Sequence, residues 1–286
     1  MTTTPTARHP GPVLQESVAH RVPAPLRPLV ASVVGYRHEG LTPSVHRGLP
    51  SPFLTLVLPI GEPLVMAAHP DPAQPGGAFD ALVGGLHTRP ALISTGTRQH
   101  GVQLSLTPAG ARALLGVPAA ALASLDVELA DLLGPAAAEL TDRVRAAGTW
   151  AGRFAAVDAV LTRIARPRPT SPELAEAWRL TAAGGRVPVT ALARHLGWSD
   201  RRLRERFRAE LGLSPQQAGR VARFDRARRR LAGSVTAGRP VDLAEFAVTS
   251  GYADQAHLTR EWRWHAGLPP RRWLAEEQML GAAEVD

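Results

Sequence analysis

The sequence predicts an α+β protein of two domains: an N-terminal antiparallel β half-barrel with helices, and a C-terminal all-α domain. Short apolar runs bounded by turn residues between positions 30 and 106 predict the sheet. A helical pattern that occurs twice between Val189 and Trp273 predicts the C-terminal domain. The proline-rich segment 166–172 predicts a stiff linker. We therefore expect domains at 1–165 and 173–276, followed by a tail at 277–286.

The N-terminal domain is predicted from its apolar runs, several of which alternate or are rich in β-branched residues. These runs are 30–36, 53–58, 63–66, 81–86, 91–94 and 100–106. Thr107 and Pro108 then predict a helix start, with Gly116 ending that helix. Further helices are expected at 122–133, 136–147 and 150–164. Residues 1–12 are rich in Thr and Pro and have no apolar run, so we expect them to be disordered.

The repeated pattern fixes the architecture of the C-terminal domain, because internal repeats define structural units. Equivalent residues lie 54 positions apart before a predicted turn and 55 apart after it, so the second turn has one additional residue. The pairs are Ala193/Ala247, Gly197/Gly251, Trp198/Tyr252, Ser199/Asp254, Leu203/Leu258, Phe207/Trp262, Gly212/Gly267 and Pro215/Pro270.

The chemistry of each copy indicates a helix-turn-helix unit. Gly197 and Gly251 suit the left-handed residue that ends a helix, and Ser199 and Asp254 suit the N-cap of the next one. Apolar residues at i and i+4 then leave the opposite face of each second helix for solvent or DNA. The alternative is a pair of ordinary helical hairpins. Two copies with matching spacing, and with arginines on their outward faces, favour DNA recognition.

The segment between the two copies predicts a connecting helix from Pro215 to about Ala232, ended by Gly233. Val221, Phe224, Ala227 and Leu231 keep a helical period and indicate a buried face. A helix of roughly 18 residues spans about 27 Å. Successive major-groove faces on one side of a duplex lie about 34 Å apart. Together with the width of the flanking units, this helix would set that spacing.

The charge distribution also points to nucleic acid. The formal net charge is +8, and all 33 basic residues are arginine. Residues 1–165 contain 12 Arg and 11 acidic residues, whereas residues 166–286 contain 21 Arg and 14 acidic residues. The basic excess therefore lies in the half that carries the repeat, as a phosphate-binding surface requires. A biased codon usage is the alternative explanation for the arginine richness, but it does not explain this asymmetry.

Several functional classes are disfavoured. The absence of cysteine excludes disulfides and thiol-based alkyl transfer, and no apolar stretch reaches the length of a membrane span or signal peptide. The histidines lack metal-ligand spacing, and no Ser-His-Asp or paired-carboxylate pattern stands out. We therefore expect a cytoplasmic protein that is not an enzyme and has no metal or cofactor. The histidines considered are His38, His46, His69, His87 and His100.

Over residues 173–275 the sequence resembles the AraC/XylS family of transcription regulators. The matching residues are Leu192, Ala193, Gly197–Ser199, Leu203, Phe207, Arg208, Gly212–Pro215, Arg223, Ala227, Leu231, Ala244, Ala247, Gly251, Tyr252, Leu258–Arg260, Trp262, Gly267–Arg271 and Trp273. The resemblance implies a bacterial, nucleoid-associated regulator that binds double-stranded DNA through two recognition helices. The base contacts it implies are Arg201, Arg204, Glu205, Gln255, Ala256, Thr259 and Arg260. The phosphate contacts considered beside them are Arg202, Arg206, Arg208 and His257.

The N-terminal half resembles the cupin-like sensor domains of such regulators, as found in actinobacterial members. This resemblance implies a small-molecule effector, a homodimer, or both, and contact with RNA polymerase if the protein is an activator. Two alternatives remain open. One is an enzymatic N-terminal domain fused to a DNA anchor; the other is a non-specific basic chromatin binder, which fits the charge but not the differentiated recognition helices.

Overall fold

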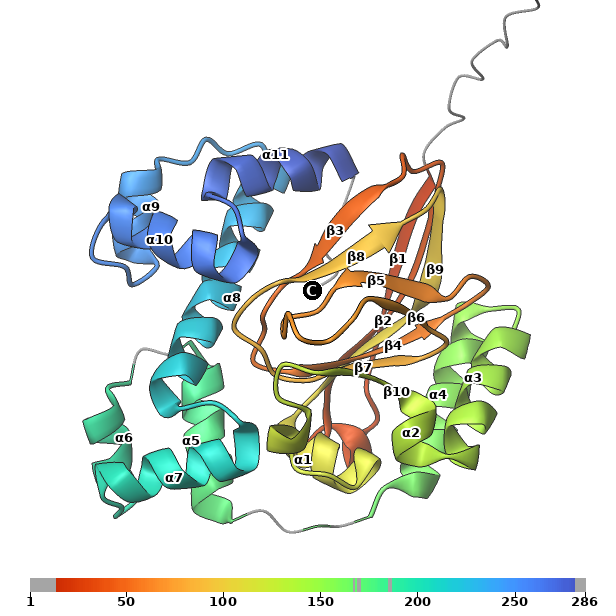
Figure 1. Cartoon of the computed structure of the whole chain (residues 1–286), viewed down its shortest axis with the longest axis horizontal. Coiled ribbons are helices and arrows are strands. Elements are labelled where there is room, and N and C mark those ends of the chain that lie inside the picture. Colours follow the sequence, from red (N-terminus) through yellow and green to blue (C-terminus); the bar gives the residue numbers. More distant parts are fainter. Residues whose placement is uncertain (1–13, 167, 169–170, 185–186, 281–286) are drawn as a thin grey trace, which may run out of the picture.

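The computed structural model describes residues 14–166, 168, 171–184 and 187–280, and Figure 1 shows two parts. The N-terminal part contains two antiparallel sheets with helices beside them, and the C-terminal part is helical. Residues 1–12, for which disorder was predicted, lie outside the described residues. Among the described residues, no helix is both long and apolar enough to cross a bilayer.

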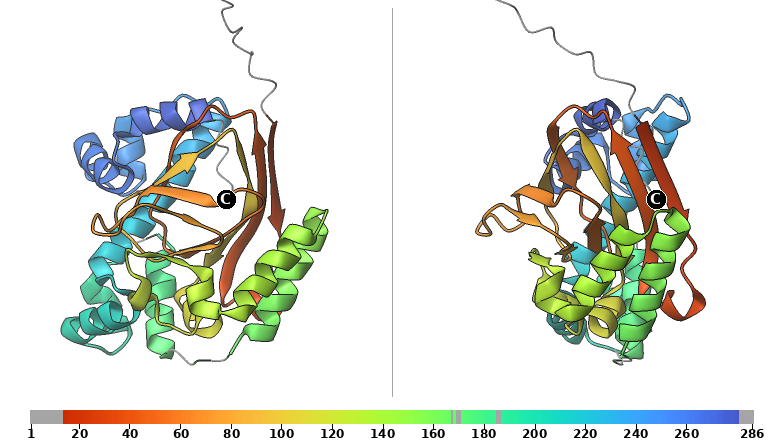
Figure 2. Two further views of the ribbon diagram at one scale, coloured as in Figure 1. Left: turned by 45° about the vertical axis from the view of Figure 1, so that its right-hand side comes forward. Right: turned by 90° about the vertical axis from the view of Figure 1, so that its right-hand side faces the viewer.

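The two sheets together form the predicted half-barrel (Figures 1 and 2). The larger has six strands in the order β1-β2-β9-β4-β7-β10, and the smaller has four in the order β3-β8-β5-β6. The strands are β1 Leu14–His20, β2 Val30–Glu39, β3 Ser44–Gly48, β4 Leu54–Pro59, β5 Leu64–Ala68, β6 Gly77–Phe79, β7 Leu82–Gly84, β8 Ala91–Thr95, β9 Arg98–Leu106 and β10 Asp126–Glu128. Four of them, β1, β3, β6 and β10, were not predicted, and β10 lies in a segment for which a helix was predicted. β1, β3 and β6 lie at sheet edges and carry exposed residues, so they lack a continuous apolar run.

Helices α3 (Pro135–Ala146) and α4 (Trp150–Ile164) confirm two predicted helices and pack beside the larger sheet (Figure 2). Their apolar residues, including Leu140 and Val157, join one buried cluster with strand residues such as Leu104. Trp150 packs so closely on β2 that a Cβ at Gly35 would lie 2.4 Å from its ring. The apolar faces of these helices are therefore part of the core and are not available as a contact surface.

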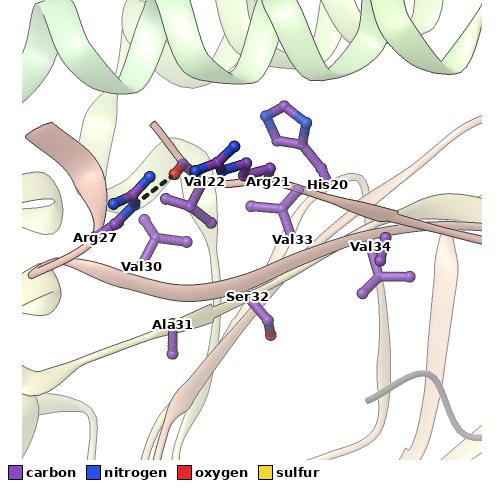
Figure 3. Close-up of a pocket in the computed structure, with 10 residues that line it drawn as sticks. His20, Arg21, Val22, Arg27, Val30, Ala31, Ser32, Val33 and Val34 are labelled. Atoms are coloured by element: carbon purple, nitrogen blue, oxygen red, sulfur yellow. Dashed lines mark hydrogen bonds between the residues drawn. The ribbon is translucent and has the colours of Figure 1, made fainter. Parts of the chain in front are cut away.

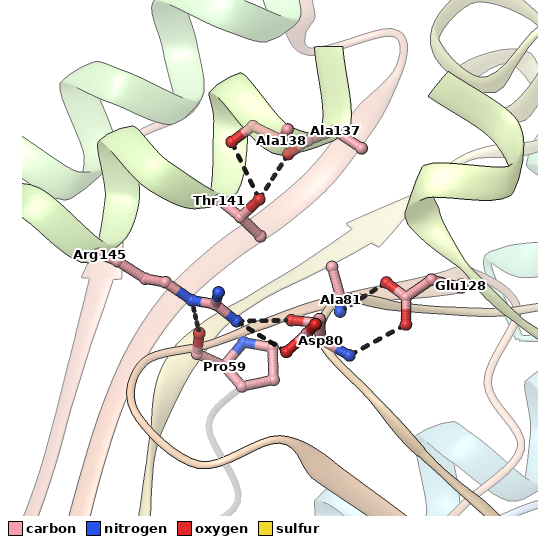
Figure 4. Close-up of polar contacts among 8 residues, drawn as sticks. All are labelled: Pro59, Asp80, Ala81, Glu128, Ala137, Ala138, Thr141 and Arg145. Carbon is pink, nitrogen blue, oxygen red and sulfur yellow. Dashed lines mark hydrogen bonds and ion pairs between the residues drawn. The ribbon is translucent and has the colours of Figure 1, made fainter. Parts of the chain in front are cut away.

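Polar contacts also tie α3 to the larger sheet (Figure 4). Arg145 donates to the carbonyl oxygens of Pro59 (3.2 Å) and Asp80 (3.1 Å). The Glu128 carboxylate accepts from the backbone N–H groups of Asp80 and Ala81 at 2.9 and 2.8 Å. These bonds satisfy backbone groups at the place where β4 ends and β7 begins.

The predicted helix over 122–133 is wrong in its first half. A 3₁₀ turn, η3 (Ala119–Leu122), is followed by strand β10, and only α2 (Leu129–Leu133) is helical. Ser124 has a φ of +62°, which breaks a helix. The buried Asp126 carboxylate then pairs with His69 Nδ1 at 2.6 Å. This long-range pair and the pairing of β10 with β7 outweigh the local helical pattern.

The segment before η3 follows the prediction. Thr107 caps α1 (Pro108–Gly110) by accepting from the Gly110 N–H, and a π-helical turn, η2 (Ala111–Leu115), continues from it. Gly116 ends this segment with a φ of +80°. A short 3₁₀ turn, η1 (Ala24–Leu26), links β1 and β2.

The C-terminal part contains seven helices among the described residues: α5 Pro172–Ala182, α6 Val189–His195, α7 Asp200–Leu211, α8 Pro215–Thr236, α9 Leu243–Thr249, α10 Gln255–Ala266 and α11 Pro270–Leu280. α5 begins inside the predicted linker, with Ser171 as its N-cap. α11 extends to Leu280, so residues 277–280 of the predicted tail are helical. Residues 281–286 lie outside the described residues.

The connecting helix α8 is longer than predicted. Ser214 and Gln217 form a capping box at its start, and the helix continues through Gly233 to Thr236. Gly233 does not end it; Gly238, with a φ of +65°, follows the last turn instead. A glycine inside a helix costs stability but is tolerated when the flanking turns remain hydrogen-bonded.

Candidate nucleic-acid interface and ligand cavity

Both helix-turn-helix units have the predicted turn geometry. Gly197 and Gly251 adopt left-handed φ values of +66° and +87°. Ser199 Oγ accepts from the Arg202 N–H at 3.2 Å, and Asp254 Oδ1 accepts from the His257 N–H at 2.6 Å. These caps fix where α7 and α10, the two recognition helices, begin.

The apolar stripe of each recognition helix is buried. Leu203 and Phe207 in α7, and Leu258 and Trp262 in α10, are 0% exposed. Because residues on the opposite face of a helix then point away from the core, the base-contact candidates lie outward. Those that are exposed are Arg201, Arg204, Glu205, Gln255, Ala256 and Arg260, while Thr259 is half-buried.

On α7, two of the base-contact candidates already bind each other. Arg201 Nε donates to Glu205 Oε1 at 2.7 Å, and both side chains are largely exposed. Arg202 lies 4.8 Å from the centre of the Trp198 ring. Arg206 and Arg208 are exposed. Glu210, near the C-terminal end of the same helix, binds Arg112 of the N-terminal part.

On α10, two of the predicted contact residues are anchored to backbone. The Thr259 hydroxyl donates to the Gln255 carbonyl at 2.8 Å. The methyl group is then the part of this side chain that remains for a contact with a base. His257 Nδ1 accepts from the Ala253 N–H at 3.2 Å, and its ring meets Tyr252 edge to face. His257 therefore stabilises the turn before α10, in addition to the phosphate contact that the resemblance implies for it.

Several arginines of α8 are engaged in contacts within the protein. Arg228 and Arg229 donate to the buried Asp225 carboxylate at 3.0 and 2.6 Å. Arg220 forms two hydrogen bonds with Glu261 of α10, at 3.0 and 2.8 Å. The exposed arginines of α7 are thus better placed for DNA than these α8 residues. Sequence reasoning missed the Arg220–Glu261 pair because the two residues lie 41 positions apart.

Glu261 is buried, with 8% of its surface exposed. Burial alone would raise the pKa of its carboxyl, but the nearby His265 and the two hydrogen bonds from Arg220 outweigh that effect and lower the pKa to about 2. The residue is therefore a carboxylate at neutral pH, and it joins α10 to α8.

The length of α8 suits two adjacent major-groove contacts. Its 22 residues span about 33 Å at 1.5 Å per residue, close to the roughly 34 Å between successive major-groove faces. In Figure 1, α7 and α10 lie beside opposite ends of α8.

The half-barrel contains a cavity of about 670 Å³ at one end. It lies between β2, the turn from β4 to β5, and the turn from β8 to β9. Burial raises the pKa of the Tyr36 phenol and lowers that of His38, against an opposing hydrogen bond from Gln99. Both side chains are therefore neutral at pH 7. Charged residues Arg37, Glu39, Glu62 and Arg98 also line it.

A second hollow, of about 510 Å³, lies where β1 leads into β2 (Figure 3). It is more open, and Arg27 donates across it to the Val22 carbonyl at 3.1 Å. Within the part of the chain that the structure describes, no group of three or more His, Cys, Asp or Glu residues is arranged to hold a metal ion.

Comparison with known proteins agrees with this geometry. Residues 192–276 match the family described as "Helix-turn-helix domain". No curated protein matches the sequence. Two structures of ToxT from Vibrio cholerae are similar in fold, with TM-scores of 0.50: one at 10% identity covers 87% of this chain and 98% of ToxT, the other at 11% covers 88% and 97%. An AraC-type regulator from Chromobacterium violaceum is 25% identical over 37% of this chain and 91% of its own, with a TM-score of 0.32.

The family match and the turn geometry together show that residues 192–276 contain a helix-turn-helix domain, here built from two units. The whole chain shares with ToxT a fold in which an N-terminal β domain is followed by a helical C-terminal part.

Proposed function

We propose that this protein is a transcription regulator that reads a specific DNA sequence with α7 and α10 and responds to a small molecule in its N-terminal domain. The reading residues are the outward side chains of the two helices: Arg201, Arg204, Glu205, Gln255, Ala256, Thr259 and Arg260. Arginine pairs with guanine, glutamine with adenine, glutamate with cytosine, and the threonine methyl with thymine. Arg202, Arg206, Arg208 and His257 would contact phosphates.

The observation that supports the sensing role is the path of the chain through β8, the β8–β9 turn and β9, where it passes from the smaller sheet to the larger one. This turn, including Thr95 and Gly96, lines the 670 Å³ cavity. Going back along β8, the chain reaches loop 86–90, whose Thr88 carbonyl accepts from His265 of α10. Going forward along β9, it reaches η2, where Arg112 binds Glu210 of α7. A ligand that moved this turn would therefore act on segments that touch both recognition helices.

The cavity has the size and polarity of a small-molecule site. Neutral Tyr36 and His38 supply hydrogen-bonding groups inside, and Leu64 and Ile60 supply apolar surface. The mouths of β-barrels are common ligand sites because the sheet walls are rigid while the turns are free to vary.

The proposal further includes self-association and action in the bacterial cytoplasm at the nucleoid, with RNA polymerase as partner if the protein activates transcription. Since the apolar faces of α3 and α4 are buried, a dimer formed through these helices would use their outward faces. Ala151, Ala155 and Ala159 are exposed there, at four-residue spacing on α4.

A cavity-blocking variant tests the sensing role. A Cβ at Gly96 would have only Glu62 within 4 Å, at 3.7 Å, so Gly96→Trp places an indole at the cavity mouth without displacing backbone. We expect compounds from a metabolite panel that raise the melting temperature of the wild type to lose this effect in Gly96→Trp. Gly148→Trp, at an open position away from the cavity, is the control. Equal shifts in all three proteins would contradict sensing in this cavity.

A further inference from the structure

The C-terminal end of α7 contacts the N-terminal domain. Arg112 of η2 forms a two-pronged ion pair with Glu210, whose side chain is 12% exposed. Beside it, Gly212 approaches η3 so closely that a Cβ there would lie 2.3 Å from the Ala123 Cβ. Its φ of +73° also requires glycine. The first unit is therefore fitted tightly to the segment 111–123.

The C-terminal end of α10 contacts a different segment of the same domain. His265 Nδ1, 1% exposed, donates to the Thr88 carbonyl at 2.8 Å. The Arg89 guanidinium lies 4.1 Å from the centre of the Trp264 ring, a cation–π contact. Arg47 of β3 also forms an ion pair with Glu276 of α11. The second unit is therefore fitted to loop 86–90 and its neighbour β3.

The two contacts use equivalent positions of the repeat. Glu210 and His265 are 55 residues apart, as are Gly212 and Gly267, and both members of each pair face the N-terminal domain. Each recognition helix thus presents its N-terminal half for bases and its C-terminal end to this domain. In Figure 1 both helices have these ends toward the half-barrel.

The two segments that contact the C-terminal ends of α7 and α10 are hydrogen-bonded to each other. The Gly85 N–H donates to the Leu125 carbonyl, and the Ser124 N–H donates to the Leu86 carbonyl, each at 2.9 Å. Gly85 passes so close to η3 that a Cβ there would lie 1.6 Å from the Leu122 oxygen. Segments 86–90 and 111–123 therefore form one connected element, which we call the docking bracket.

We propose that the docking bracket holds the two recognition helices in one relative orientation and thereby makes the protein selective for the spacing between its two DNA half-elements. Outside the bracket, the two units are joined through α8. A second connection, through the docking bracket, makes the two units one rigid frame. The entropy cost of fixing the two units relative to each other is then met when the protein folds, and not when it binds DNA. One inserted base pair shifts a half-element by about 3.4 Å, which a rigid frame does not accommodate.

The first experiment measures the frame without DNA. The chain has no cysteine, so spin labels at Arg208→Cys and Arg263→Cys report only the distance between α7 and α10. We expect one narrow distance distribution in the full-length protein and a wider one after Arg112→Glu. The charge swap Arg112→Glu with Glu210→Arg should restore the narrow distribution. Arg163→Glu, which breaks an ion pair with Glu139 inside the N-terminal domain, is the matched control.

The second experiment measures spacing selectivity. A site selected from random DNA by the full-length protein is compared with the same site carrying one inserted base pair between its half-elements. We expect Arg112→Glu to bind the selected site about tenfold more weakly and to lose most of its discrimination against the insertion, with recovery in the charge swap. If Arg112→Glu proves unstable, Arg47→Glu, with and without Glu276→Arg, tests the other contact. Unchanged distance distributions and unchanged discrimination in these folded variants would overturn the proposal.

Discussion

Arg220 and Glu261 join the connecting helix to the second recognition helix through two hydrogen bonds of 3.0 and 2.8 Å. Arg223 lies 3.9 Å from the same carboxylate, and His265 lies 3.8 Å away. A buried carboxylate is stable only with such partners. The pair therefore fixes α10 on α8, behind the face that we assign to DNA.

Removing this carboxylate should destabilise the second unit. We expect Glu261→Gln to lower the free energy of unfolding by about 1.5–3 kcal/mol at pH 7, the usual range for hydrogen bonds to charged groups. Because the folded-state pKa is depressed to about 2, the stabilisation is present above the unfolded value of 4.5 and is lost as pH falls from 4.5 toward 2. Urea unfolding of both proteins across this range measures the difference. A difference that did not shrink toward pH 2 would contradict the assignment.

Two glycine substitutions should have opposite effects on stability. Gly233 lies inside α8 with open space around its Cβ position, so Gly233→Ala should raise the free energy of unfolding by about 0.5–1 kcal/mol. Gly85→Ala should lower it by about 1–3 kcal/mol, because its Cβ would overlap the Leu122 carbonyl. Thermal melts of both variants and the wild type measure the two changes in stability. A neutral Gly85→Ala would show that this close approach is not fixed.

Truncation should affect the two units unequally. The sequence predicts that residues 170–286 fold alone, with Trp198, Trp262, Trp264 and Trp273 in the core. Of these four residues, only Trp262 and Trp273 are buried, and Trp264 is 41% exposed. The apolar cluster of the first unit is continuous with that of the N-terminal domain, whereas the second unit has its own.

We therefore expect the fragment 171–286 to be helical by circular dichroism but to lose hydrogen-exchange protection in α7 more than in α10. Equal protection in the two helices would show that the N-terminal domain contributes nothing to the first unit. An unfolded fragment would show that the whole domain depends on it.

The sequence predicted the C-terminal domain well because its signals are local. Gly197 and Ser199 specify a turn and a cap through their own backbone preferences, and the spacing of Leu203 and Phe207 specifies which face is buried. The repeat supplied each signal twice. The helix predicted at 150–164 has the bounds of α4, and in the structure Thr149 caps it by accepting from the Gly152 N–H.

What the sequence did not predict depends on contacts between distant residues. Asp126 becomes part of a strand because of His69, 57 positions away. Glu210 turns toward Arg112, 98 positions away, rather than toward its own helix. No local pattern encodes such partners, so the docking of the two domains could not be predicted from the sequence.

Self-association should be visible in the length of protected DNA. A reader with two recognition helices occupies one site as a monomer, and a dimer doubles the number of half-elements. We expect full-length protein to protect about twice the length that fragment 171–286 protects, and sedimentation of the free protein to show a dimer. A monomer with a footprint equal to that of the fragment would leave sensing as the role of the N-terminal domain.

Base reading by the second recognition helix can be tested with two arginines that differ in their contacts. Arg260 is exposed on the outward face of α10, whereas Arg229 of α8 binds the buried Asp225. Arg260→Ala should weaken binding to the preferred site by about 1–3 kcal/mol and relax sequence preference at one base pair, because bidentate arginine contacts discriminate between bases.

Arg229→Ala, the control, should change binding to preferred and random DNA alike, since it removes charge and an internal ion pair but no base contact. Titrations of both variants on the selected site and on random DNA, at two salt concentrations, separate these effects. Equal losses on both DNAs for Arg260→Ala would assign Arg260 to the phosphate backbone instead.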